Sequence, residues 1–311
     1  MIAWARHHRG LIRLYLHHIE IFIFCKYLLL YVKPDIVLIS SIKDPASINI
    51  RDLLIKKYNP ERLTDRKING FTVYHFRTYN KLIEIITISS DLIYAEELNK
   101  RVNGKLFIFL SRHKSEEALP TLTAHVPGNW LNTAPYGGRP KDVCIAPAKM
   151  LSVFIKALYR ERSKLKLDDW KCSLEATHHG PYIEEVPTMF VEIGSSIKEW
   201  TNKTAAEAIV NALDCVFKAD MGDVAAIGIG GPHYAPKITK FVLEENIPVG
   251  HIIPKYVTSH IGDYELNMAI KKTFEDVKYA VIDWKGIRGT DRRRIINILK
   301  ERYSYIDIVK I

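Results

Sequence analysis

Residues 35–57 read DIVLISSIKDPASINIRDLLIKK, and this stretch decides the fold class. Ile36–Ser40 is a continuous apolar run, which is the pattern of a strand buried on both faces. A short polar loop, Ser41–Pro45, follows, and helical periodicity then continues to Lys57. A buried strand that passes directly into a helix is the first half of a βαβ unit, so we expect an α/β fold.

The same alternation of strands and helices continues to the C-terminus. The predicted strands are Phe71–Phe76, Leu82–Ile88, Leu106–Leu110, Lys171–Thr177, Thr188–Ile193, Val224–Ile229, His251–Ile253, Ala280–Asp283 and Ile306–Val309. The predicted helices are Met150–Leu165, Thr204–Phe217, Lys237–Glu245, Tyr264–Phe274 and Asp291–Arg302. Asn129–Pro140 is a long Gly- and Pro-rich loop. We predict a single three-layer α/β domain over residues 34–311, with a mixed, mostly parallel sheet.

The composition is that of a globular protein with a basic surface. The 311 residues are 47% hydrophobic and 26% charged, which provides a sizeable core and excludes a disordered chain. The formal net charge is +10, from 45 Lys and Arg against 35 Asp and Glu. This excess favours a polyanionic partner. A merely basic, solvated surface explains it equally well, because the cations are scattered along the chain.

The cysteines give no sign of a metal or redox motif. Cys25, Cys144, Cys172 and Cys215 form no C-x-x-C pair, so neither a zinc ribbon nor a redox dithiol is indicated. Each is interpreted as a small buried hydrophobic residue. A reducing compartment suits them best, and we expect a cytoplasmic protein.

Residues 1–33 differ from the rest of the chain. Leu11–Val32 is apolar but is interrupted by charged residues and histidines, and its longest clean run is Ile21–Cys25. That run is far too short to cross a membrane, and no small-residue cleavage site follows it. An amphipathic extension, a weak anchor and a start codon placed upstream of the true one stay open. We expect a dispensable extension outside the fold or a misassigned start, and no membrane partner.

Candidate functional residues lie where predicted strands end, because ligands of α/β folds bind beyond the carboxyl ends of the strands. Ser40–Ser47 offers hydroxyls, Lys43 and free helix N–H groups, which suit a phosphate or ribose and equally an ordinary helix cap. Arg112 and His113 follow a later buried strand. They favour an anion site, with a solvated loop as the alternative.

Two adjacent histidines and a carboxylate form the next candidates. His178 and His179 end a predicted strand, and the Gly-Pro pair after them makes plausible a turn that brings both rings to one site. Glu192 lies inside an apolar strand, and its burial requires a cation, a metal or a histidine N–H. A structural ion pair is the alternative explanation for this carboxylate.

Two Gly- or Pro-flanked segments carry the last candidates. His233 follows two glycines that allow close approach of the backbone to a ligand, and Lys237 lies one turn later. His251 and Lys255 lie in a further segment, although His251 can equally just begin a strand. The chain has no Walker loop, H-E-x-x-H or G-x-S-x-G motif. Four separated strand-end segments that each offer a histidine therefore predict a hydrolytic site with no named substrate.

Taken in order, these segments resemble the archaeal and plant type of D-aminoacyl-tRNA deacylase. The matching stretches are DPASINI (44–50), SRH (111–113), PTLT (120–123), GN (128–129), YGG (136–138), SLEATHHGP (173–181), FVEIGSS (190–196), GGPHYAPK (230–237), GHIIPKY (250–256) and DWKG (283–286). They span nearly all of residues 35–311. They do not cover residues 1–33, which favours a misplaced start.

The resemblance implies a zinc-dependent hydrolase with a fold similar to those of peptidyl-tRNA hydrolases and nucleoside phosphorylases. It implies cleavage of the ester between tRNA and a D-amino acid, or misattached glycine, with aminoacyl-tRNA as the nucleic-acid partner. We expect a monomer with no stable protein partner. The predicted catalytic residues are His113, His178, His179 and His233. The predicted zinc ligands are His178, His179, Glu192 and His233, with His251 in reserve, and the predicted phosphate-binding residues are Lys43, Arg112, Lys237 and Lys255.

Three alternatives stay open. A histidine could act as the general base without a metal. A phosphorylase-like enzyme acting on nucleosides or nucleotides would use phosphate instead of water as the nucleophile. A non-catalytic tRNA-binding protein is also permitted by the basic charge. The number of histidines and the buried position of Glu192 argue against the last, since phosphate binding requires neither.

Overall fold

The apolar run at the start of the predicted domain forms strand β1 (Ile36–Ser41), and all of its residues are buried. Helix α2 (Pro45–Tyr58) follows after a short turn. Its N-cap is Asp44, whose side chain accepts a hydrogen bond from the Ser47 N–H at 2.9 Å. The strand, loop and helix predicted from residues 35–57 are therefore confirmed.

The structure is a computed structural model that describes residues 33–68, 70–96, 98–115 and 119–311. Within it, Asp35–Ile311 forms one compact unit. The prediction that residues 1–33 are an extension or a misassigned start falls, apart from Lys33, on residues outside the described part of the chain.

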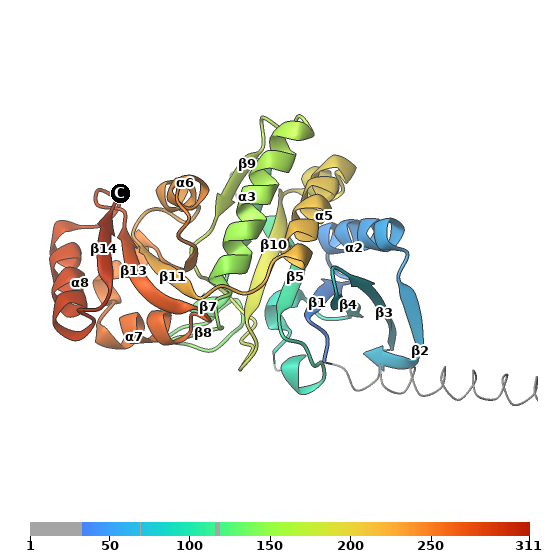
Figure 1. The fold of residues 1–311 in the computed structure, drawn as a ribbon, viewed down its shortest axis with the longest axis horizontal. Coiled ribbons are helices and arrows are strands. Elements are labelled where there is room, and N and C mark those ends of the chain that lie inside the picture. Colours follow the sequence, from blue (N-terminus) through green and yellow to red (C-terminus); the bar gives the residue numbers. More distant parts are fainter. Residues whose placement is uncertain (1–32, 69, 97, 116–118) are drawn as a thin grey trace, which may run out of the picture. The chain divides into compact units, whose positions relative to one another are not determined.

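Eight strands form a large sheet in the order β2-β3-β4-β1-β5-β10-β6-β9 (Figure 1). The remaining bounds are β2 Glu61–Ile68, β3 Phe71–Thr78, β4 Lys81–Ile88, β5 Phe107–Lys114, β6 Thr121–His125, β9 Lys171–Leu174 and β10 Thr188–Ser195. In its centre, β4, β1, β5 and β10 run parallel, and β6 runs antiparallel to β10. The parallel arrangement brings the carboxyl ends of β1, β5 and β10 to the same edge of the sheet.

A second sheet has four parallel strands in the order β12-β11-β13-β14. Its strands are β11 Val224–Ile229, β12 Val249–Ile253, β13 Asp276–Ile282 and β14 Asp307–Lys310. All four were predicted as strands, but the apolar pattern of a strand does not tell which sheet it joins. Parallel pairs predominate over the two sheets, so the predicted mixed, mostly parallel α/β architecture is confirmed.

The helices pack mainly beside the sheets. They are α3 Ala148–Lys164, α4 Ile197–Trp200, α5 Lys203–Lys218, α6 Pro236–Glu244, α7 Asp263–Lys271 and α8 Gly289–Arg302, with short 3₁₀ helices η1 Leu92–Tyr94, η2 Leu98–Lys100 and η3 Lys255–His260. A small two-stranded sheet is formed by β7 (Gly128–Asn129) and β8 (Asp142–Val143). Helices α2, α5 and α3 lie side by side over the large sheet (Figure 1), and α3 also packs against β11 and β12. In the described residues, no helix has the length and hydropathy needed to span a bilayer.

Two strands of the large sheet were not predicted. β2 carries several charged residues at the edge of the sheet, so it lacks an apolar run. β6 has the sequence TLTAH, which is too short for a clear periodicity. In addition, β5 continues to Lys114 through its pairing with β10, so Arg112 and His113 lie inside the strand and not after it.

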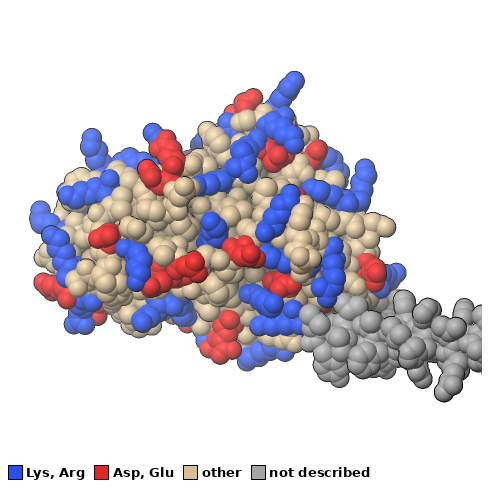
Figure 2. Space-filling model, in the orientation of Figure 1, with Lys and Arg blue, Asp and Glu red and all other residues tan. Residues whose placement is uncertain are grey.

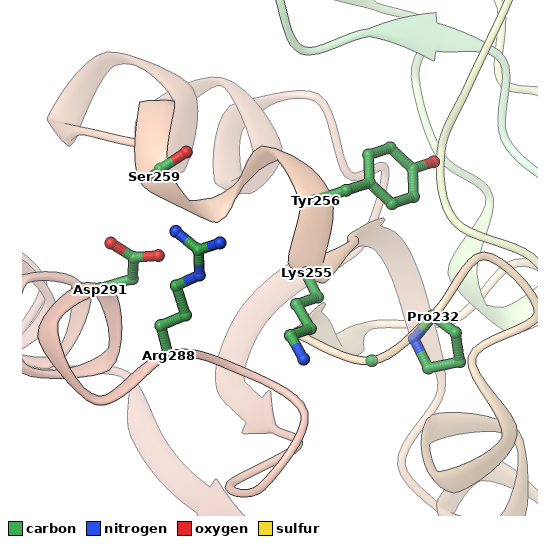
Figure 3. Close-up of a pocket in the computed structure, with 7 residues that line it drawn as sticks. Pro232, Lys255, Tyr256, Ser259, Arg288 and Asp291 are labelled. Carbon is green, nitrogen blue, oxygen red and sulfur yellow. The ribbon is translucent and has the colours of Figure 1, made fainter.

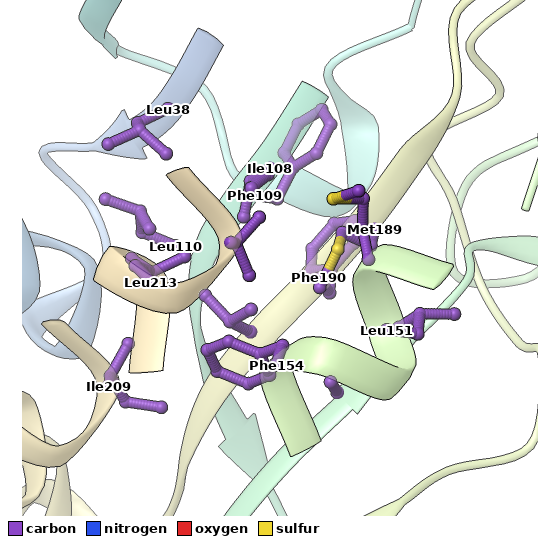
Figure 4. Close-up of a cluster of buried hydrophobic side chains, with 14 of the residues drawn as sticks. Leu38, Ile108, Phe109, Leu110, Leu151, Phe154, Met189, Phe190, Ile209 and Leu213 are labelled. Atoms are coloured by element: carbon purple, nitrogen blue, oxygen red, sulfur yellow. The ribbon is translucent and has the colours of Figure 1, made fainter. Parts of the chain in front are cut away.

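The apolar core holds the central strands in register. Phe109 of β5 and Phe190 of β10 are register partners and stack with ring centroids 4.7 Å apart. Leu213 of α5 and Phe154 of α3 pack in the same cluster of buried side chains (Figure 4). Full burial of each such side chain is worth about 1.5–3 kcal/mol. The His125 ring of β6 continues the stack on Phe190 at 5.1 Å, so the core also positions a polar ring.

Candidate active site

Three neighbouring strands of the large sheet bring polar side chains to one face. Glu192 of β10 is the register partner of Ser111 in β5 and of Thr123 in β6. Because alternate residues of a strand share a face, His113 of β5 and His125 of β6 lie on the same face as Glu192. All three of these side chains are buried.

The segments after β9 and β11 complete the group. Glu175 directly follows β9, and His178 and His179 come shortly after it. The chain turns at His179, whose φ is 44°, so both adjacent rings reach the same site. His233 follows β11, and its carbonyl accepts a hydrogen bond from the Ala176 N–H at 2.8 Å, which joins the two loops.

These side chains form what we call the histidine–glutamate cluster, with Glu175 at its centre. Its members are His113, His125, Glu175, His178, His179, Glu192 and His233. Glu175 Oε1 lies 3.1 Å from His113 Nδ1. Glu175 Oε2 lies 3.3 Å from His233 Nε2, 3.6 Å from His125 Nδ1 and 3.7 Å from His178 Nε2. One buried carboxylate therefore faces four histidines that come from four segments.

The two adjacent histidines are held as neutral rings. His178 Nδ1 lies 2.8 Å from the Ala176 carbonyl oxygen, and His179 Nδ1 lies 2.6 Å from the Gly180 carbonyl oxygen. A carbonyl only accepts hydrogen bonds, so each Nδ1 carries the proton and each Nε2 keeps a free lone pair. Burial lowers the pKa of His178 well below its usual value and that of His179 to about 4. Both Nε2 atoms are thus prepared to bind an electrophile.

The centre of the cluster contains polar atoms without hydrogen-bond partners. In the described part of the chain, both ring nitrogens of His125 and both carboxylate oxygens of Glu175 are buried in this way. The close approaches of histidine nitrogens to Glu175 are ion-pair contacts without directed hydrogen-bond geometry. Leaving a buried polar group unpartnered costs about 1–3 kcal/mol. A further group that supplies the missing interactions would therefore stabilise the fold.

Three sets of ligand atoms in the cluster lie close enough together to hold a metal ion. Within each set, the ligand atoms are within 4.8 Å of one another. The sets are His125, His178 and His179; His113, Glu175 and His233; and His125, Glu175 and Glu192. Neutral imidazole and carboxylate are ligands that zinc binds in proteins, and a three-histidine set leaves the fourth position open for catalysis. The residues present therefore fit a zinc ion.

The charges within the cluster are divided unequally. Burial alone would lower the pKa of His113, but the Glu175 and Glu192 carboxylates raise it to about 9. Burial would raise the pKa of Glu175, yet the surrounding histidines, His113 first, hold it at about 2. Burial, reinforced by Glu175, raises the pKa of Glu192 to about 7. At neutral pH, Glu192 is the carboxyl group that can readily gain or lose a proton.

The structure places His251, the reserve candidate, outside the cluster. Its Nε2 lies 3.0 Å from the Lys272 carbonyl oxygen, so this nitrogen carries the proton. Its Nδ1 lies 3.1 Å from the Thr177 hydroxyl, which donates to it. Both ring nitrogens are therefore engaged, and the ring supports the loop that carries His178.

Two of the predicted phosphate-binding residues share one surface carboxylate. Lys43 Nζ lies 3.4 Å and an Arg112 guanidinium nitrogen 3.8 Å from the Asp91 carboxylate. The guanidinium also lies over the Trp200 ring at 5.4 Å. Figure 2 shows Lys and Arg spread over the visible face with Asp and Glu between them. Because carboxylates lie between the cations, a polyanion would meet only small basic areas on this face.

The other two candidates lie beside the second sheet. Lys237 is paired with the Asp283 carboxylate at 2.6 Å. Lys255 lines a pocket of about 300 Å³ together with Arg288 and Tyr256 (Figure 3). The structure therefore separates the four predicted cations into two groups.

Two members of the cluster were not found in the sequence. His125 ends the short β6 strand that was not predicted, and Glu175 follows the buried end of β9. The argument applied to Glu192, that a carboxylate in a buried segment needs a partner, also holds for Glu175 in LEATHH. The five other members are all among the residues singled out from the sequence.

Comparison with known proteins gives a consistent result. Residues 101–306, which include the whole cluster, match a family model described as D-aminoacyl-tRNA deacylase. A D-aminoacyl-tRNA deacylase of Pyrococcus furiosus is 38% identical over 263 residues, which cover 80% of this chain and 91% of the relative. One of Methanocaldococcus jannaschii is 37% identical over 273 residues, covering 85% of this chain and 95% of the relative.

A solved structure shares the fold over most of the chain. The crystal structure of AF0625, a conserved protein of unknown function, matches with a TM-score of 0.78 and 27% sequence identity. The match covers 89% of this chain and 95% of that one. On the family model and the identities to these relatives, the chain belongs to the D-aminoacyl-tRNA deacylase family.

Proposed function

We propose that this protein hydrolyses the ester bond of D-aminoacyl-tRNA, and of tRNA misacylated with glycine, releasing the free amino acid and tRNA. We further propose that it does so as a zinc-dependent monomer in the cytoplasm. Family membership supports the ester and the tRNA, because the matching relatives carry this activity in their name. The observation that carries the proposal is the buried Glu175 carboxylate, which is surrounded by histidines and has no hydrogen-bond partner among the described residues.

The zinc ligands are proposed from the state of the rings. His178 and His179, both predicted from the sequence, offer bare Nε2 atoms, and His125 has two unpartnered nitrogens in the same set. Glu192 and His233, the other predicted ligands, belong to the two sets that include Glu175. With zinc on the three histidines, Glu192 and His233 would both stay free to transfer protons. When bound, zinc would lower the pKa of a water molecule to about 7 and polarise the ester carbonyl.

The protein's own residues hold and move the protons. Glu192, with its pKa near 7, is suited to accept a proton from the attacking water. Its Oε2 lies 3.3 Å from His113 Nδ1, so the protonated His113 ring holds this carboxylate in place. The His233 side chain is 31% exposed, so the substrate can reach it, and its ring suits proton donation to the leaving ribose oxygen.

Contacts to tRNA phosphates are proposed for the two groups of cations. Lys43 and Arg112 lie beside the carboxyl ends of β1 and β5, and Lys237 and Lys255 lie beyond those of β11 and β12. Phosphate contacts position a nucleic acid without reading its sequence. This suits an enzyme that acts on many tRNAs with a common 3′ end.

Deacylation of paired D-Tyr-tRNA and L-Tyr-tRNA tests the proposal. The zinc-loaded protein is expected to release D-tyrosine only, and a chelator is expected to abolish release until zinc is restored. The His178→Ala variant is expected to lose both zinc and activity. The His75→Ala variant is the matched control, because His75 lies on β3 and pairs with Glu61 at 3.3 Å, away from the cluster.

Other outcomes would identify the alternatives. Turnover that depends on added phosphate would indicate a phosphorylase-like enzyme. Salt-sensitive tRNA binding without release of any amino acid would indicate a binding protein. Full activity after complete removal of zinc would contradict the metal-dependent mechanism and favour a histidine acting alone as the general base.

A further inference from the structure

A pocket of about 300 Å³ lies beyond the carboxyl ends of β11 and β12 (Figure 3). It is lined by Gly231, Pro232, Lys255, Tyr256, Ser259, Arg288 and Asp291. In parallel α/β sheets this edge is where ligands bind. Lys255 was predicted to bind phosphate, and Gly231, Pro232 and Tyr256 lie in the stretches that resemble the family, whereas Ser259, Arg288 and Asp291 were not singled out from the sequence.

The pocket holds two cations, Lys255 and Arg288. Within the described part of the chain, neither Lys255 nor Arg288 makes an ion pair. The one carboxylate of the pocket is already engaged, because Asp291 Oδ2 accepts a hydrogen bond from Thr258 Oγ1 at 3.1 Å and Oδ1 lies 3.3 Å from Arg294. Two unpaired cations beside a serine hydroxyl suit a phosphate, which accepts hydrogen bonds from guanidinium, ammonium and hydroxyl groups.

The other side of the pocket leads toward the histidine–glutamate cluster. Figure 3 shows Lys255 between Arg288 on one side and Tyr256 and Pro232 on the other. Pro232 directly precedes His233, whose Nε2 lies 3.3 Å from Glu175. Tyr256 is 59% exposed, and an exposed aromatic ring beside a cationic pocket is suited to stack on a nucleobase.

We propose that this pocket binds the terminal nucleotide of the substrate, with its 5′-phosphate held by Lys255 and Arg288 and its base stacked on Tyr256. In an aminoacyl-tRNA, a single ribose separates the ester from that phosphate. The pocket wall runs from Lys255 through Pro232 to the cluster. The phosphate site and the proposed site of ester cleavage therefore follow one another in the same order as the phosphate and the ester of the substrate. The inference rests on the proposed ester hydrolysis and adds the part of the tRNA that the second sheet holds.

Two small esters test the phosphate contact directly. The substrates are 3′-O-(D-tyrosyl)adenosine and the same ester with a 5′-phosphate. For the wild-type protein, kcat/KM is expected to be about tenfold or more higher for the phosphorylated ester, because a hydrogen bond to a charged group is gained. In Arg288→Ala and Lys255→Ala this advantage is expected to shrink toward onefold, because the kcat/KM of the phosphorylated ester falls more than that of the unphosphorylated ester.

Matched variants separate charge from structure. Arg293→Ala removes an exposed cation of α8 that does not line the pocket, so the advantage of the phosphorylated ester is expected to stay. Tyr256→Ala is expected to slow both esters by about tenfold through lost stacking, whereas Tyr256→Phe keeps the rate. AMP is expected to inhibit more strongly than adenosine, and this difference disappears in Arg288→Ala.

Several outcomes would overturn the assignment. If Arg288→Ala and Lys255→Ala slow both esters equally, the two cations have only a structural role. If inorganic phosphate inhibits as strongly as AMP, the pocket is a site for free phosphate. Failure of the proposed function looks different, because the wild-type protein would then cleave neither ester.

Discussion

Glu175 Oε1 lies 3.1 Å from His113 Nδ1, and both side chains are buried. This contact explains how a histidine inside the fold keeps a proton at neutral pH. Glu192 lies 3.3 Å from the same ring nitrogen, and burial, reinforced by the charge of Glu175, raises its pKa to about 7. Pairs of titratable groups whose pKa values are pushed apart are typical of acid–base sites.

Replacement of Glu175 by Gln removes the negative charge and keeps the size of the side chain. We expect the pKa of His113 to fall from about 9 toward or below its usual value, because burial then meets less opposing charge. Deacylation is expected to drop by about 100-fold or more. An NMR titration of the imidazole in metal-free protein and single-turnover assays measure both effects. Glu207→Gln on the exposed face of α5 is the control, and an unchanged His113 pKa would refute the pairing.

The buried ring of His251 is expected to lower the free energy of unfolding in acid. Burial lowers its pKa to about 4 in the folded protein, against about 6.5 in an unfolded chain. Between these values the unfolded state binds more protons, so the free energy of unfolding falls as the pH falls from 6.5 to 4. The full contribution is present above pH 6.5, and its loss amounts to roughly 3 kcal/mol.

The His251→Gln variant tests this contribution, because Gln can donate and accept hydrogen bonds but does not titrate. Urea unfolding at several pH values between 7 and 4.5 is expected to show a flatter profile for the variant than for the wild type. The variant is also expected to be less stable than the wild type at pH 7, because Gln cannot make the contacts to Lys272 and Thr177 with the geometry of the imidazole ring. Parallel pH profiles would show that His251 does not stay neutral in the fold.

Much of this site could be predicted because its residues follow clear apolar runs. Glu192 lies inside β10 and His233 comes after β11, two strands with several buried apolar residues that are visible in a sequence. His178 comes after the shorter β9, and it was predicted from the Gly-Pro pair that follows the two histidines. His125 was missed because β6 is short and contains two threonines, so its burial depends on pairing with β10. The gathering of these residues around Glu175 could not be predicted, because it depends on contacts between segments far apart in the chain.

The division of the strands into two sheets could also not be predicted from the sequence. β10 and β11 have similar apolar patterns, yet β10 pairs with β5 and β6, whereas β11 pairs with β12 and β13. Strand order depends on contacts between distant segments, and here α3 contacts strands of both sheets. The periodicity of a single strand contains no information about these neighbours.

We predict that position 180, occupied by Gly180, tolerates no side chain. Its N–H donates to the Tyr136 carbonyl at 3.0 Å, and a Cβ at this position would overlap the backbone of Gly137 and Gly138. Gly180→Ala is therefore expected to displace the adjacent His179 and to lower zinc content and deacylation together, with the far-UV circular dichroism spectrum retained.

Gly262→Ala is the matched control for that substitution. The nearest atom to a Cβ there is Glu265 Oε2 at 3.6 Å, an ordinary van der Waals distance. Zinc content and activity are expected to stay at the wild-type level. Equal loss of zinc in both glycine variants would mean that the effect is general and not local to the cluster.

Substitutions of Phe190 and Phe154 distinguish a general loss of core stability from a loss of the position of His125. Both rings are fully buried, and Ala at either position is expected to lower the free energy of unfolding by about 3–5 kcal/mol, measured by urea titration. Phe190 also stacks on His125 with planes 18° apart, whereas Phe154 lies on α3. Loss of a residue that orients a ligand weakens metal binding by about tenfold or more. Competition with a chelator is therefore expected to show weaker zinc binding in Phe190→Ala but not in Phe154→Ala, and equal affinities would exclude His125 as a ligand positioned by the core.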